Sequence, residues 1–292
     1  MASTQLLKRR VRSISNTKQI TKAMELVAAA KMRRVAEAAR RSRAYADAAS
    51  SILLRLSKTP EAAQHPYFRP PAGKPNLYVI FTSDSGLAGA YNANVFNAAA
   101  RAFNEDAKTS GKHSVIVFGR KGAHHFSRGS NIELLGAYEK VEDEPDMNVF
   151  APVLNTITQS FNEARFSSLQ LIFTQSVSTL VQQVRTLQLL PVPEQVKAEP
   201  GESRLPAVAY TLEPDGNAVL DSALRLYFES SLRRARVESA AAEHAMRMVS
   251  MGSATRNATD LIDALTLELN ATRQAAITQE VAEIIGGAEA IS

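Results

Sequence analysis

A glycine-containing loop is the first place in this chain where residue types and spacing could support chemistry. Residues 82–89 read Thr-Ser-Asp-Ser-Gly-Leu-Ala-Gly and stand between a predicted strand and a predicted helix, the usual position of a phosphate-binding loop. The loop lacks the third glycine of a dinucleotide fingerprint and the Gly-Lys-Ser/Thr of a Walker loop. We therefore expect a plain turn and helix start, and keep a nucleotide-dependent enzyme as the weakest alternative.

Metal and thiol chemistry have few candidates. His124 and His125 are adjacent, so on a helix their side chains point in different directions, and the sequence has no His-Glu-x-x-His spacing. Residues 142–144 are acidic, but they lack the ligand alternation and glycine of a calcium loop, and we expect a solvated loop there. The chain has no cysteine, which excludes disulfides, iron–sulfur clusters and thiol nucleophiles. We predict no catalytic, cofactor-binding or metal-binding residue.

The positions of helix breakers indicate three regions. All 12 prolines lie between Pro60 and Pro214, the first glycine is Gly73, and from residue 217 to residue 285 the only glycine is Gly252. We therefore predict a long helix in residues 1–59, an inserted domain in residues 75–212 and a second long helix in residues 216–292. Helices of this length need a partner, and the simplest partner for each is the other, running antiparallel.

A heptad pattern in the first helix supports this pairing. Alternate steps of four and three meet eleven apolar residues in fifteen positions, as in a coiled-coil seam. The seam positions are Leu7, Val11, Ile14, Lys18, Thr21, Glu25, Ala28, Met32, Val35, Ala39, Ser42, Ala46, Ala49, Leu53 and Leu56. Three of the polar exceptions cluster at Lys18, Thr21 and Glu25, where we expect the seam to fail and some side chains to point outward.

The charges of the chain are unevenly distributed. Residues 1–58 contain 14 Lys or Arg against three acidic residues, whereas the rest of the chain is mildly acidic. This asymmetry favours pairing of a basic first helix with an acidic last one. The basic segment could also be a transit peptide, a nucleic-acid contact or a grip on acidic protein surfaces. Its arginines lie all around the helix without an aromatic platform, which argues against nucleic acid.

The middle of the chain alternates strand and helix patterns. Residues 76–82, 113–119 and 168–174 are short β-branched and aromatic runs, separated by helical patterns at residues 93–108 and 146–164. Residues 181–190 and 207–212 are predicted to be further strands at the edge. This pattern predicts an α/β domain with a mainly parallel sheet. The apolar runs are too short to span a membrane, so any membrane association must be peripheral.

Three separated segments resemble the gamma subunit of rotary, F-type ATP synthases. Residues 12–32 (RSISNTKQITKAMELVAAAKM) are similar to the opening helix of that family, and residues 83–89 with Asn92 are similar to its Ser-Asp-x-Gly-Leu-x-Gly segment. Residues 273–288, which include Arg-Gln-Ala, Ile-Thr-Gln-Glu and Gly-Gly-Ala, match its terminal signature. The chain departs from the family at Arg256, where an acidic residue is common before the asparagine.

The resemblance implies a long antiparallel two-helix coiled coil with an inserted small α/β, Rossmann-like domain. In the family this coiled coil is the central shaft inside a hexamer of alpha and beta subunits, and it couples proton or ion flow to ATP synthesis. The expected partners are alpha, beta, epsilon and the membrane c-ring, with no nucleic acid, no cofactor and no direct nucleotide binding. The gamma subunit itself is a non-catalytic part of the enzyme complex, and the chloroplast type with a redox switch would need two cysteines.

We expect two patches to touch the hexamer. The first comprises Lys18, Lys22, Met24 and Glu25. The second comprises Arg273, Gln274, Thr278 and Glu280 and should lie opposite the first if the helices are antiparallel. The alternative is that these polar residues are solvated or pair with each other across the coil. An apolar tip at Val281, Ile284, Ile285 and Ala288 resembles the apical bearing of the family.

Cell location and a rival function complete the expectations. Family-like residues begin near the N-terminus, so residues 1–32 are expected to be mature helix, and a start at Met1 favours a bacterial protein. Its place would be peripheral, on the cytoplasmic face of the inner membrane, with the matrix side of the mitochondrial inner membrane as the alternative. The main rival is a coiled-coil scaffold or tether whose α/β domain is a binding module.

Overall fold

The computed structural model describes residues 2–68, 74–106, 112–192, 212–213 and 215–289. Contacts divide the protein into two compact units. The larger unit contains residues 30–246, and the smaller unit combines residues up to Ala29 with those from Arg247 onward. The two long helices, α1 (Ala2–Leu56) and α6 (Gly216–Glu289), contribute to both units. Every other described helix and strand belongs to the larger unit.

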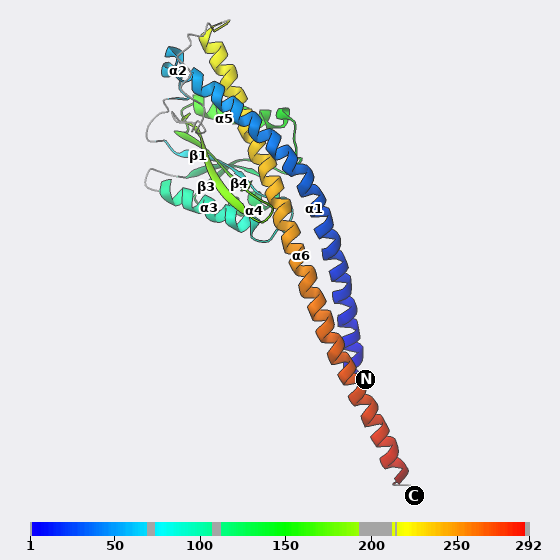
Figure 1. The fold of residues 1–292 in the computed structure, drawn as a ribbon. Coiled ribbons are helices and arrows are strands. Elements are labelled where there is room, and N and C mark those ends of the chain that lie inside the picture. The colour runs from blue at the N-terminus through cyan, green and yellow to red at the C-terminus, as the bar shows by residue number, and fades with distance from the viewer. Residues whose placement is uncertain (1, 69–73, 107–111, 193–211, 214, 290–292) are drawn as a thin grey trace. The chain divides into compact units, whose positions relative to one another are not determined.

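A five-stranded sheet of order β3-β2-β1-β4-β5 forms the centre of the larger unit (Figure 1). Strands β1 to β4 are parallel, and β5 pairs antiparallel with β4 at one edge. The strands are β1 (Asn76–Phe81), β2 (His113–Phe118), β3 (Ile132–Tyr138), β4 (Ser168–Ser176) and β5 (Gln182–Leu190). The shorter helices are α2 (Pro60–Gln64), α3 (Tyr91–Asp106), α4 (Arg120–Phe126) and α5 (Ala151–Asn162), the last preceded by a 3-10 turn, η1 (Met147–Phe150).

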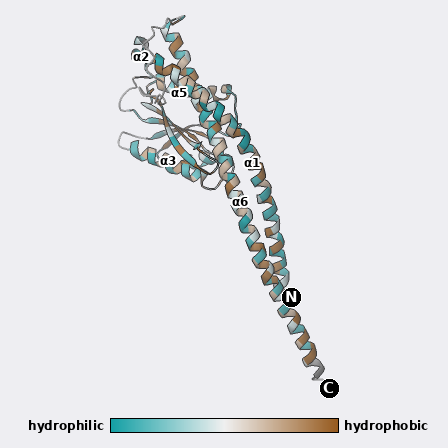
Figure 2. Cartoon of the chain, viewed as in Figure 1, coloured by the Kyte–Doolittle hydropathy of each residue, from teal (hydrophilic) through white to brown (hydrophobic). Residues whose placement is uncertain are grey.

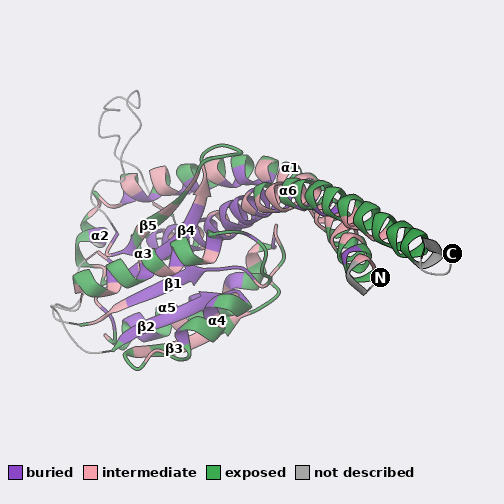
Figure 3. Ribbon diagram, turned by 90° about the horizontal axis from the view of Figure 1, so that it is seen from below, coloured by how far each residue is buried: buried purple, intermediate pink, exposed green. Residues whose placement is uncertain are grey.

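Helices cover both faces of this sheet, as the alternation of side chains along each strand requires. Tyr78 and Ile80 of β1 point to the face covered by α3 and α4. Leu77, Val79 and Phe81 point to the other face, where they pack with α5, the last turns of α1 and the first half of α6. Figure 3 shows β1 and β2 almost wholly buried. The ends of both long helices therefore complete the core of the domain.

Small side chains let α1 and α6 approach closely within the larger unit. Val35, Ala38 and Ala39 of α1 pack against Val237, Ala240 and Ala241 of α6. Ion pairs flank this contact, because Arg43 pairs with Glu238 at 3.0 Å and Asp47 pairs with Arg234 at 2.8 Å. Residue numbers rise along α1 as they fall along its partner, so the two helices are antiparallel here.

The same pairing continues in the smaller unit with polar residues. The Thr255 hydroxyl donates to the Thr21 hydroxyl at 2.9 Å, and Glu25 lies against Gly252. All fifteen heptad positions of α1 are buried or half-buried. Apolar and polar residues mix along both long helices in Figure 2, and α6 passes from buried to fully exposed toward its C-terminal end in Figure 3.

The α/β class, the antiparallel coiled coil and the expected strands β1, β2, β4 and β5 are confirmed. Sequence reasoning missed β3, α2 and α4. Of the strand predicted at residues 207–212, residues 207–211 lie outside the described residues, and Leu212 has no regular structure. Nowhere in the described residues is there a helix with the length and apolar character needed to cross a membrane.

Candidate functional site

The first predicted patch lies on the seam of the smaller unit. Lys18, Thr21 and Glu25 are half-buried, and Met24 is too, so the expectation that the seam fails here and turns its side chains outward was wrong for most of them. The seam accepts polar residues because the threonine hydroxyls bond across it and because Gly252 leaves room for the Glu25 carboxylate. Lys22 is the exposed member, and its ammonium pairs with Glu25 at 3.2 Å.

The second predicted patch lies farther along α6. Arg273, Gln274, Thr278 and Glu280 are all exposed. They do not lie opposite the first patch, because Thr21 pairs with Thr255 and Arg273 comes 18 positions later. That separation is about 27 Å along a helix. The expectation failed because it assumed a pairing register that the heptad pattern alone does not define.

The apolar tip is an exposed apolar part of α6. The side chains of Val281 and Ile285 are at least half exposed, and that of Ile284 is 71% exposed. Ala288 belongs to the helix, but its side chain lies outside the described part of the chain. These exposed apolar side chains lie within five positions of one another near the end of the helix.

The glycine-containing loop is a turn that hydrogen bonds hold to its own domain. Asn92 donates to the Ser83 hydroxyl at 2.8 Å, and the Ser83 amide donates to the Asn92 side chain at 3.1 Å. The Asp84 carboxylate accepts the backbone amides of Arg120 and Lys140 at 3.0 and 3.1 Å. Asp84 thus engages the first amide of α4, and its negative charge would repel a phosphate at that end of the helix.

The carboxyl ends of β1 and β4 enclose the crevice in which doubly wound sheets bind their ligands. In this chain α6 occupies that crevice. The Thr174 amide at the end of β4 donates to the Ser239 hydroxyl at 3.3 Å, and Tyr91 packs with Ala88 and Ala242. Burial, with the nearby Glu243 charge, raises the pKa of Tyr91 well above its usual range. The buried ring is thus held neutral as a packing residue.

The acidic residues 142–144 are not simply solvated, contrary to expectation. Asp143 pairs with Arg236 at 3.2 Å and with His244 at 2.8 Å, and Glu144 pairs with Arg41 at 3.3 Å. Burial alone would raise the pKa of Asp143. The His244 hydrogen bond and the charges of His244, Arg236 and Lys31 outweigh this and lower it to about 2. Sequence reasoning missed these contacts because their partners lie about a hundred positions away.

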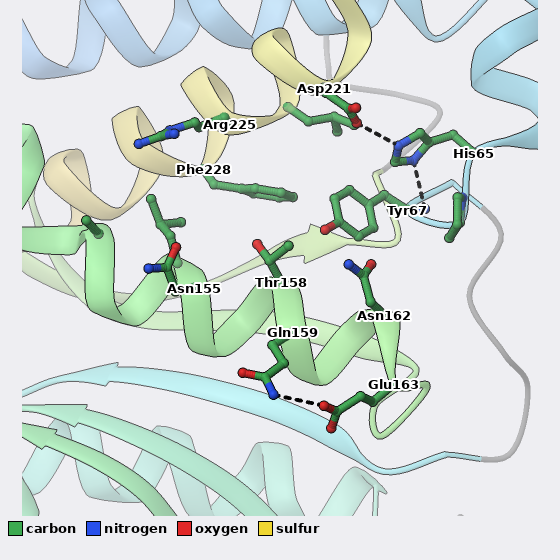
Figure 4. A pocket seen from close by; sticks show the side chains of 14 residues that line it. His65, Tyr67, Asn155, Thr158, Gln159, Asn162, Glu163, Asp221, Arg225 and Phe228 are labelled. Carbon is green, nitrogen blue, oxygen red and sulfur yellow. Dashed lines mark hydrogen bonds and ion pairs between the residues drawn. The ribbon is translucent and has the colours of Figure 1, made fainter. Parts of the chain in front are cut away.

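A hollow of about 940 Å³ opens between the segment that follows α2, helix α5 and the start of α6 (Figure 4). Asn155, Thr158 and Asn162 point into it from one face of α5, and Phe228 and Tyr67 form an apolar side. Its charged residues are engaged, since Asp221 pairs with His65 at 3.1 Å. Such a lining suits an uncharged polar group or protein segment.

The histidines that sequence reasoning considered for a metal do not form a site. His125 on α4 stacks on Phe96 with ring centroids 3.9 Å apart, and burial lowers its pKa, with a smaller effect from His124. Among the described residues, no three His, Asp or Glu side chains gather closely enough to hold a metal ion.

Comparison with known proteins identifies relatives of the whole chain. A family model described as ATP synthase matches residues 3–291. The ATP synthase gamma chain of Heliobacterium modesticaldum is 38% identical over 289 residues, covering 98% of each chain. That of Legionella pneumophila is 35% identical over 293 residues, covering 100% of each. A rotor chain of the Euglena gracilis mitochondrial ATP synthase is 17% identical with a TM-score of 0.65, covering 94% of this chain and 99% of its own, and shows the same fold.

Proposed function

The chain belongs to the ATP synthase gamma-chain family, and we propose that its coiled coil drives catalysis as a rotor through asymmetric contacts with a ring of nucleotide-binding subunits. It is the central-stalk subunit of an F-type ATP synthase. The observation that carries the proposal is the end of α6, where every residue from Arg273 to Gly286 except Ala276 is exposed. The second patch and the apolar tip lie there, and neither has a partner within the described residues.

The mechanism follows from differential binding. A partner shifts a conformational equilibrium only by its different affinity for the two states. A single asymmetric helix pair inside a threefold ring presents a different face to each catalytic subunit. Each subunit is thereby biased to a different nucleotide affinity, and turning the shaft cycles these affinities. The contact patches are assigned as Lys18, Lys22, Met24 and Glu25 on α1, and as Arg273, Gln274, Thr278 and Glu280 on α6.

The exposed charges suit a contact that must exchange during rotation. Charged hydrogen bonds to acidic loops are strong enough to transmit force, yet exposed ion pairs contribute only about 0–1 kcal/mol each and so exchange readily. The apolar tip at Val281, Ile284, Ile285 and Ala288 would turn in an apolar sleeve. Because Lys18 and Glu25 are half-buried, Lys22 is the member of the first patch best placed to reach a partner.

The individual subunits that this chain contacts are also proposals. We infer contacts with alpha and beta along the coiled coil, and with epsilon and the c-ring at the foot, where the hollow beside the start of α6 offers hydrogen-bonding and apolar groups. The location inferred is peripheral, on the cytoplasmic face of a bacterial inner membrane, supported by bacterial relatives. Direct nucleotide binding is not expected, because α6 packs into the crevice at the carboxyl ends of β1 and β4.

The test is a double substitution in the assembled complex. Arg273→Ala with Gln274→Ala should lower ATP-driven turnover severalfold while leaving the unfolding midpoint of the chain unchanged, because both side chains are exposed. Arg128→Ala, an exposed arginine after α4, is the matched control. Unchanged turnover in the double variant would overturn the assignment of this patch.

Purification of the tagged chain with its partners distinguishes between the rival functions. A tagged chain recovered from detergent-solubilised membranes should bring down two nucleotide-binding subunits and ATP hydrolysis activity. A lone inactive chain from well-preserved membranes would favour the scaffold instead. Filter binding of labelled ATP to the isolated chain would favour the enzyme.

A further inference from the structure

The loop formed by residues 139–146, here called the acidic loop, joins three elements of the larger unit. It follows β3 and precedes η1, so it belongs to the α/β domain. Glu144 accepts from Arg41 of α1 at 3.3 Å and lies 3.9 Å from Arg233 of α6. Asp143 pairs with Arg236 and His244, both of α6. One loop of the domain therefore holds both helices of the coil.

Backbone contacts hold the loop in place. Arg236 donates to the Val141 carbonyl at 2.7 Å, and Arg233 donates to the Pro145 carbonyl at 3.2 Å. On the domain side, the Lys140 amide donates to Asp84 at 3.1 Å, and Lys140 has the left-handed backbone angle φ of 54°. A non-glycine residue held in that region indicates a loop whose path is imposed by its contacts.

Apolar packing fixes other parts of the same assembly. Leu53 and Leu56 at the end of α1 enter the domain core, and α6 enters it from Leu220 to Ala235. Between Val35 and Ala39, α1 forms an apolar cluster with α6 that contains no residue of the α/β domain. The acidic loop adds an attachment of α1 to the domain at Arg41, which lies between these two apolar contacts.

We propose that the acidic loop is an electrostatic clasp that makes α1, α6 and the α/β domain move as one body when the stalk carries torque. This inference rests on the central-stalk role and goes beyond the contacts with the ring. Packed helices slide past one another at little cost, as in shear motions. A slide of one residue moves a helix by about 1.5 Å, which is enough to break hydrogen bonds of 2.7 to 3.3 Å. The more deeply buried pairs of Asp143 with Arg236 and His244 therefore resist the sliding that alanine-rich packing permits, and the exposed Arg41–Glu144 pair extends this attachment to α1.

A cysteine pair gives a clean test, since the chain has no cysteine of its own. Arg41→Cys with Glu144→Cys removes the clasp contact to α1 and allows a short bismaleimide to restore it covalently. In the full complex in vesicles, we expect protons pumped per ATP hydrolysed to fall by roughly twofold in the unlinked variant. Linking should return the ratio to the value of the wild type.

The control is Arg41→Cys with Glu144→Ser, treated identically, because it loses the same contact but offers the reagent only one thiol. Its ratio should stay low after treatment. A normal ratio in the unlinked Arg41 variant, or no recovery on linking, would overturn the clasp.

A second measurement separates the clasp from the rotor role. In the isolated chain, Glu144→Arg should raise hydrogen exchange of the amides in residues 139–146 by roughly tenfold, because two arginines then repel the loop. Unchanged exchange would overturn the clasp whatever the complex does. A wild-type chain that supports no ATP-driven pumping would instead overturn the rotor role.

Discussion

At the scale of single residues, Glu238 is a fully buried carboxylate that depends on two arginine partners. Its side chain is 0% exposed, and one carboxylate oxygen accepts from Arg43 at 3.0 Å and from Arg234 at 3.1 Å. A buried carboxylate without a cation is strongly unfavourable, whereas the arginines are partly exposed and reach water. The network therefore stabilises the coil only while it is complete.

This predicts an asymmetry between two variants. Arg43→Met with Arg234→Met should lower the free energy of unfolding by about 3–5 kcal/mol, because Glu238 is left buried and unpaired. Adding Glu238→Met should recover most of that loss, since apolar residues of similar size then fill the site. Urea unfolding of the three proteins checks this. Equal losses in the double and triple variants would contradict it.

The Asp143 carboxylate predicts an acid-sensitive contribution to stability. Its folded pKa of about 2 lies below the ordinary value of 3.8. The stabilisation is thus complete above about pH 4 and is lost as the pH falls toward 2. Asp143→Asn should cost about 2 kcal/mol at pH 7, and the difference from the wild type should vanish near pH 2. Urea unfolding at several pH values measures this, and a difference that stays constant with pH would rule out the ion pair as its cause.

Residue roles could be read from the sequence only where they depend on neighbours in the chain. Arg273 and Gln274 are exposed, and their contact with a partner stays a prediction. The half-buried state of Thr21 and Glu25 was missed, because their contacts, Thr255 and Gly252, lie more than two hundred positions away. The ion pairs of residues 142–144 were missed for the same reason.

At the scale of elements, α1 and α6 leave little space between them at Gly252 in the smaller unit. A methyl group added there would meet the Glu25 carboxyl carbon at 3.4 Å, which is close to ordinary contact. Alanine therefore fits, and it stabilises a helix interior by up to about 1 kcal/mol relative to glycine. A larger side chain does not fit without separating the helices.

We predict that Gly252→Ala raises the free energy of unfolding by about 0.5–1 kcal/mol, whereas Gly252→Leu lowers it by about 1–3 kcal/mol through overpacking. Urea unfolding, with circular dichroism of helix content, measures both. A destabilising alanine would mean that the two helices cannot give by the few tenths of an ångström that a methyl group needs.

The elements found from sequence were those with strong local signals. Breaker positions and the heptad pattern identified α1 and α6, and continuous apolar runs identified β1, β2 and β4. Strand β3 (IELLGAY) was missed because it is an edge strand with a glycine. Its pairing with β2 also shifts register between Val115 and Ile116, so the alternation that marks a half-buried strand is broken.

At the scale of the whole molecule, the exposed end of α6 predicts a separation of stability from activity. Truncation after Glu280 removes Val281, Ile284 and Ile285, which are exposed in the free chain. The free energy of unfolding should stay within about 0.5 kcal/mol of that of the full chain, while ATP-driven turnover falls severalfold. Denaturation and turnover of the same preparation test this, and a large loss of stability would show that the tip packs on its own chain.

The packing of the chain's two ends has a consequence for its synthesis. Val35 finds its neighbours Val237 and Ala240 only after some two hundred further residues have been made. At a synthesis rate of about 5–20 residues per second, the apolar face of α1 stays exposed for roughly 10–40 seconds before α6 is made. The sheet waits as well, because Leu220 and Tyr227 complete its core. A nascent chain of this kind needs protection on the ribosome until its last helix emerges, and mutations that slow elongation late in the message should favour aggregation over assembly.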